Sequence, residues 1–93
     1  HKNYSPAQQK EVAKKLTYLI YSKIDCLNKG EDTFLVDEKI TELLESDIGK
    51  SLDANEIFKA RKEATEKYKL LEKVPVDDEV FRASLETKTG KKM

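Results

Sequence analysis

Apolar residues recur at helical spacing along the first third of the chain. Between residues 5 and 28 they stand at Val12, Leu16, Leu19, Ile20, Ile24 and Leu27, with spacings of four, three, one, four and three positions. This spacing places one apolar stripe on one side of a long helix. Ser5 suits the N-cap of that helix, with Gln8 completing a capping box. Pro6 suits the first helical position and Gly30 a left-handed C-cap. The rest of the chain is expected to fold against this stripe.

Two further segments carry the same periodicity. A second helix is predicted from near Thr33, and it weakens around Gly49, which could end it or bend it. Its stripe is Val36, Ile40, Leu43 and Leu44. A third helix is predicted from an Asp53-x-x-Glu56 capping box to the residue before Pro75, because that residue resists the helical conformation. Its stripe is Ile57, Ala60 or Arg61, Ala64, Tyr68 and Leu71, and Glu63 and Lys67 are spaced for an ion pair.

A short fourth helix is predicted over 78–86, and the basic segment 87–93 is predicted to be a flexible, disordered tail. The fold class expected is all-α: a small bundle of three main helices plus a short fourth, in a single domain over residues 1–86. The predicted core is Val12, Leu16, Leu19, Ile20, Ile24, Leu27, Val36, Ile40, Leu43, Leu44, Ile48, Ile57, Ala64 and Leu71.

Composition narrows the class of protein. Charged residues make up 39% of the 93 residues and balance to a net charge of zero, which is typical of a soluble bundle with solvated faces. The single cysteine, Cys26, excludes an internal disulfide and favours an intracellular location, in nucleus or cytoplasm. No apolar run is long enough to span a membrane, so no membrane partner is expected.

Residues for catalysis or metal binding are sparse. The only histidine is His1, so a serine or cysteine nucleophile elsewhere has no histidine base. The acidic cluster Glu31, Asp32, Asp37 and Glu38 lacks the spacing of a calcium loop, and the isolated glycines do not form a phosphate-binding loop. We therefore expect a protein that is not an enzyme and holds neither metal nor cofactor.

Protein binding is the favoured function. Grooves between bundled helices accept a partner's amphipathic helix or a disordered acidic–hydrophobic motif. Apolar residues at the edges of the stripes are the candidate partner-binding residues, although any of them could instead belong to the core. They are Tyr18, Tyr21, Phe34, Leu35, Phe58 and Tyr68, with Phe34 and Leu35 also expected to anchor the turn before the second helix.

Two alternatives remain open. Basic residues of the first and third helices could form a nucleic-acid-binding face, although acidic residues are interleaved with them. These residues are Lys10, Lys14, Lys15, Lys59, Arg61, Lys62 and Lys69. Alternatively, the long first helix could self-associate, giving a homodimer.

One segment resembles a known family. The run Leu43-Leu44, Ser46 and Ile48-Gly49-Lys50, followed by a helix over 57–71, is similar to the N-terminal domain of the transcription elongation factor TFIIS. Tyr68 stands where that family usually has tryptophan. The resemblance implies an adaptor or scaffold, associated with transcription, that binds disordered motifs through the grooves between its helices.

Overall fold

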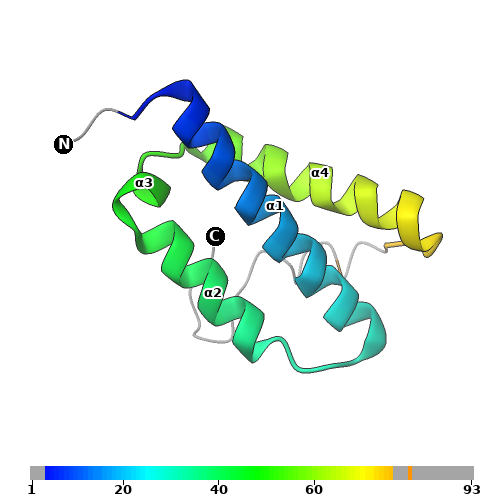
Figure 1. Cartoon of the computed structure of the whole chain (residues 1–93). Coiled ribbons are helices and arrows are strands. Elements are labelled where there is room, and N and C mark those ends of the chain that lie inside the picture. The colour runs from blue at the N-terminus through cyan, green and yellow to red at the C-terminus, as the bar shows by residue number, and fades with distance from the viewer. Residues whose placement is uncertain (1–3, 77–79, 81–93) are drawn as a thin grey trace.

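The computed structural model describes residues 4–76 and Val80, and these fold into four helices (Figure 1). The helices are α1 (Pro6–Lys29), α2 (Phe34–Glu45), α3 (Asp47–Lys50) and α4 (Ala54–Glu72). No strand occurs in these residues, and the predicted all-α class is confirmed. The helix predicted over 78–86 and the tail predicted over 87–93 lie outside the described residues, except for Val80, which packs with Val76 against the core.

Hydrogen bonds at the helix ends explain where α1 and α4 begin. The Ser5 hydroxyl accepts from the Gln8 amide at 3.2 Å, and the Gln8 side chain accepts from the Ser5 amide at 2.9 Å. Asp53 Oδ1 accepts from the Glu56 amide at 2.8 Å. At its other end α1 stops at Gly30, whose φ of 70° lies in the left-handed region that favours glycine. The predicted starts of these two helices and the predicted end of α1 are therefore confirmed.

The joint between α2 and α3 depends on Ser46 and Gly49. Ser46 ends α2 and caps α3, because its hydroxyl accepts from the Gly49 amide at 3.1 Å and donates to the Leu43 carbonyl at 2.6 Å. Gly49 is buried inside α3, where a Cβ atom would overlap the carbonyl oxygen of Leu43. This glycine therefore permits a close approach of two helices rather than ending one.

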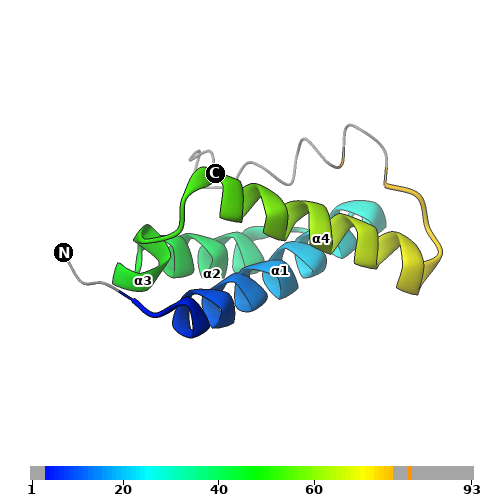
Figure 2. The same ribbon diagram turned by 90° about the horizontal axis from the view of Figure 1, so that it is seen from above.

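Helix α1 lies between its two long neighbours in Figure 1, and Figure 2 shows that it crosses α4 at an angle. It runs antiparallel to α2 and parallel to α4. Gln9 donates to Ser51 just before α4 at 3.4 Å, and Tyr68 late in α4 donates to Asp25 late in α1 at 2.9 Å. Within the described residues, α2 and α4 have few contacts with each other, so α1 holds the three helices together.

The core follows the predicted stripes, but it also contains Leu52, Ala60 and Tyr68, which the predicted core did not include, and it lacks Leu27 and Leu71. Its buried apolar residues are Val12, Leu16, Ile20, Ile24, Ile40, Leu52, Ala60, Ala64 and Tyr68, and Leu19, Val36, Leu43, Leu44, Ile48 and Ile57 pack partly buried against them. Leu27 is half-buried. The core prediction for Leu71 is wrong, because its side chain is 67% exposed. Leu71 lies in the last turn of α4, where it lines a hollow between α4 and α1.

Candidate functional site

A groove of about 890 Å³ lies between α1 and α4. Its walls are formed by residues between Pro6 and Tyr21 of α1 and between Glu56 and Leu71 of α4. We call it the α1/α4 groove. At about 1.5 Å of rise per residue, each wall is ~22 Å long, or about four helical turns.

Small side chains form the middle of the α1/α4 groove. Ala13 and Thr17 of α1 and Ala60 of α4 line it together. The Thr17 hydroxyl donates to the Ala13 carbonyl at 2.9 Å, so its polar group is satisfied within α1. Helix axes approach more closely where the residues between them are small. A third helix could therefore lie against both walls.

Two tyrosines join the helices toward the far end of the groove. The rings of Tyr21 and Tyr68 meet edge to face, with centroids 5.3 Å apart. Tyr21 donates to Glu72 at 2.7 Å, and this hydrogen bond is the main cause that raises the pKa of Tyr21 to about 12. Tyr68 donates to Asp25, which also pairs with Lys29 at 3.0 Å. These contacts hold the end of the groove in place, with Leu71 exposed beside it.

Charged side chains line both walls. The α1 wall carries Lys10 and Lys14, and the α4 wall carries in order Glu56, Lys59, Glu63 and Lys67. All are solvent-exposed except Glu56, which is half-buried. Within the part of the chain that the structure describes, none of the six forms an ion pair, and the pair predicted between Glu63 and Lys67 is absent. Their charges are therefore available to an external ligand.

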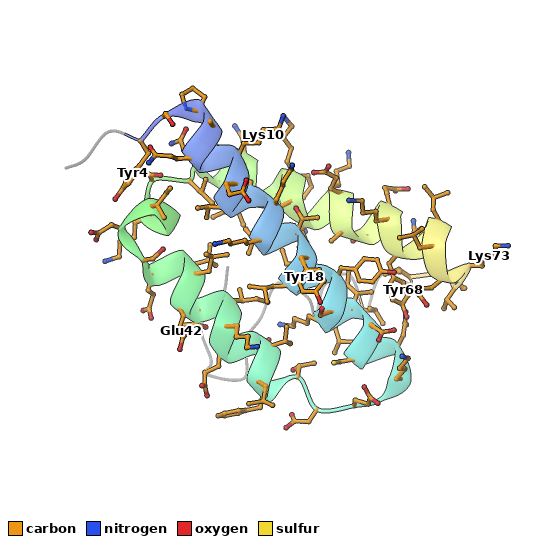
Figure 3. The ribbon with its side chains drawn as sticks, in the orientation of Figure 1. Tyr4, Lys10, Tyr18, Glu42, Tyr68 and Lys73 are labelled. Carbon is orange, nitrogen blue, oxygen red and sulfur yellow. The ribbon has the colours of Figure 1, made fainter. Side chains whose placement is uncertain are left out.

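A second, smaller groove lies on the other side of α1. It has a volume of about 550 Å³ and is lined by residues that include Lys15 and Leu19 of α1 and Lys39, Glu42 and Leu43 of α2. Tyr18 and Lys14 line both grooves. Tyr18 is 70% exposed and lies on the outer side of α1, at the front of the molecule in Figure 3.

The six predicted partner-binding residues are not brought together. Tyr18 and Tyr21 line the α1/α4 groove. Tyr68, labelled in Figure 3, is only 2% exposed and belongs to the core, where its ring contacts the ring of Tyr21. Phe34 and Leu35 are exposed in the first turn of α2, so the expectation that they pack as an anchor is wrong. Phe58 lies under the Arg61 guanidinium, 5.1 Å from the ring centroid, and does not line either groove.

The predicted nucleic-acid-binding residues are also spread over different surfaces. Lys10, Lys14 and Lys59 line the α1/α4 groove, whereas Lys15 lines the smaller one. Lys62 and Lys69 are exposed outside both grooves, and Lys69 lies 3.8 Å from Glu66. Arg61 is 5% exposed, and its burial lowers its pKa, so it cannot contribute to an exposed basic face.

Sequence reasoning missed Leu71 and the alanines as groove residues. Leu71 and Ala60 fall on the apolar stripe of α4. A stripe shows which side of a helix faces its neighbours, but it does not show how far along the helix each neighbour extends. The alternating charges of α4 at one-turn spacing, from Glu56 to Lys67, were a signal in the sequence for one wall of the groove.

Groups suited to catalysis are not gathered at either groove. Burial raises the pKa of the Cys26 thiol, and the carboxylates of Glu31 and Asp25 raise it further, so the thiol is protonated at neutral pH. Among the described residues, no three His, Cys, Asp or Glu side chains are grouped to hold a metal ion. None of the described helices is long and apolar enough to cross a membrane.

Comparisons with known proteins add no family to this description. No protein-family model matches the chain, and searches of curated proteins and of solved structures found no match. The case for a function is therefore carried by the geometry of the α1/α4 groove.

Proposed function

We propose that the protein is a non-catalytic helical interaction module, which binds a helix of a partner protein in the α1/α4 groove. The observation that carries the proposal is the groove itself, with about 890 Å³ of open volume between α1 and α4. An amphipathic helix laid into an apolar groove is a recurring mode of peptide recognition.

The composition of the groove supports a helix as its occupant. Its middle is formed by Ala13, Thr17 and Ala60, and its far end offers Leu71, which is 67% exposed. Tyr18 adds a large, exposed amphipathic side chain at the edge of the α1 wall. Large aromatic side chains beside a small-residue floor are well suited to anchor a partner's apolar stripe.

Two adjacent leucines of α4 provide a matched test. Leu70 and Leu71 are 74% and 67% exposed, but only Leu71 lines the α1/α4 groove. Helical peptides would be selected from an unbiased display library against the full chain, and their affinities measured by fluorescence anisotropy. We expect Leu71→Ala to weaken the selected peptides about tenfold, or ~1.4 kcal/mol, and Leu70→Ala to leave their affinity unchanged.

The same experiment can refute the proposal. Peptides that bind equally well to Leu71→Ala and to the parent would place the recognition surface elsewhere. A second copy of the chain is the competing occupant, and light scattering over a range of concentrations would detect it. If the chain forms a dimer that Leu71→Ala dissociates and Leu70→Ala does not, the occupant of the groove is a second copy of the chain and not a foreign helix.

The transcription-associated adaptor role follows only from the resemblance of the run 43–50, with the helix over 57–71, to the elongation-factor domain. No finding from the comparisons bears on it, so it stays a prediction. The groove and its test do not depend on that role.

A further inference from the structure

We infer that the α1/α4 groove selects an amphipathic helix with one acidic edge and one edge of alternating charge, and fixes its register. This inference rests on the proposed function, because it describes the helix that the groove would bind. The observation that supports it is the order of the charged residues along the two walls of the groove.

The two walls differ in their charge pattern. The α1 wall carries Lys10 and Lys14 and no acidic residue. On the α4 wall the sign alternates, from Glu56 to Lys59, Glu63 and Lys67. These four residues follow one another at spacings of three, four and four positions, which puts about one charge on each helical turn.

A helix bound in the groove presents one edge to each wall. Carboxylates on its first edge would meet the lysines of α1. Its second edge would carry lysine or arginine opposite Glu56 and Glu63, and carboxylates opposite Lys59 and Lys67. A slip by one turn, about 5.4 Å, would place like charges opposite each other along the α4 wall. The alternation therefore favours one register over its neighbours.

The same pattern disfavours other occupants. A nucleic acid presents only negative phosphates, and these would lie against Glu56 and Glu63 of the α4 wall. A two-fold dimer formed through this groove would use the same surface on both subunits. That surface carries four lysines and two glutamates, so the interface would hold an excess of positive charge. A foreign helix can complement both walls at once.

Three synthetic peptides of about 16 residues would test the inference with the full chain. All would share one apolar stripe and one length. The matched peptide carries the acidic edge and the alternating edge. The isomer has lysine and glutamate exchanged along the alternating edge. The neutral peptide has glutamine at all edge positions. We expect the matched peptide to bind about tenfold more tightly than the isomer of identical net charge, because several charge pairs change sign.

Paired charge exchanges in α4 test whether the α4 wall causes the preference for the matched peptide. Glu63→Lys combined with Lys67→Glu should remove the preference for the matched peptide. The control combines Lys62→Glu with Glu66→Lys, which exchanges the same two charge types on exposed residues of α4 that do not line the groove. That control should keep the preference.

The outcomes separate this inference from the proposed function. Equal binding of all three peptides would overturn the charge register and leave the helix-binding groove intact. No binding of any peptide would overturn both. Displacement of the matched peptide by an equal concentration of a single-stranded oligonucleotide would overturn the choice of a protein helix as the occupant.

Discussion

Lys23 and Asp37 carry opposite charges in the interior, where neither side chain meets solvent. Lys23 Nζ lies 2.8 Å from Asp37 Oδ1, and the two side chains are 2% and 1% exposed. The Thr33 hydroxyl donates to Asp37 Oδ2 at 2.8 Å. Removing two charges from water costs free energy that their mutual attraction offsets only when the geometry is good. The pair connects α1 to the first turn of α2.

Removing one member of this pair should destabilise the protein strongly. Lys23→Met leaves Asp37 as a buried charge without its counter-ion, and Asp37→Leu does the same to Lys23. We expect each single change to lower the free energy of unfolding by about 3–5 kcal/mol, and the double change to recover most of that loss. Urea titration followed by circular dichroism would measure all three.

An exposed ion pair gives the control. Glu66→Gln removes the partner of Lys69, at 3.8 Å on the surface, and should change the free energy of unfolding by less than about 1 kcal/mol. Single changes at Lys23 or Asp37 that are equally mild would contradict the burial of the pair.

Apolar spacing predicted most of the interior but did not identify these charged residues. Lys23 follows Ile20 by three positions, and Asp37 precedes Ile40 by three, so each interrupts an apolar stripe. The opposite charges of these two positions, on successive helices, were a signal in the sequence for an ion pair between them. Burial of a lysine depends on a counter-ion supplied by another helix, and the periodicity of one helix carries no information about that partner.

At the scale of the elements, the short α3 is held against α2 by the closeness of two backbones. Gly49 is helical and buried, and a Cβ atom there would meet the carbonyl oxygen of Leu43. Alanine has the higher helix propensity, which by itself would stabilise α3 by up to about 1 kcal/mol. The close approach of Gly49 to Leu43 opposes this gain, because a methyl group at position 49 would overlap the backbone of α2.

The sign of the effect of Gly49→Ala therefore tests the joint. We expect a loss of about 1–3 kcal/mol in the free energy of unfolding, because the backbone of α2 must move to admit the methyl group. Gly30→Asn is the control, since no atom lies within 4 Å of a Cβ there and asparagine tolerates a positive φ. It should cost less than about 1 kcal/mol, and a stabilised Gly49→Ala would contradict the packing of α3 on α2.

Helix ends were predicted better than the joint. Ser5, Gly30 and Asp53 act locally, through hydrogen bonds or backbone angles within a few residues, so the sequence around them was sufficient. The role of Gly49 depends on a carbonyl six positions earlier and on a change of chain direction at Ser46. The α1/α4 groove depends in turn on where two helices separate, which residue spacing does not encode.

At the scale of the whole molecule, α1 is the element that both long neighbours share. The side chain of Leu16 is fully buried, whereas Tyr18 two positions later is 70% exposed. Leu16→Asp should abolish the cooperative thermal transition, because it buries a charge in the shared core. Tyr18→Asp should retain that transition in the same circular-dichroism melt. A normal melt of Leu16→Asp would show that α2 and α4 do not depend on α1.

The central place of α1 also sets an order of events during synthesis. Its antiparallel partner α2 follows after a short loop, but α4, with which α1 makes its most extensive contact, begins only at Ala54. The α1–α2 hairpin can close from local contacts, whereas docking of α4 is a non-local step that waits for more chain. A nascent chain paused before residue 54 therefore exposes to chaperones the side of α1 that α4 covers in the folded protein.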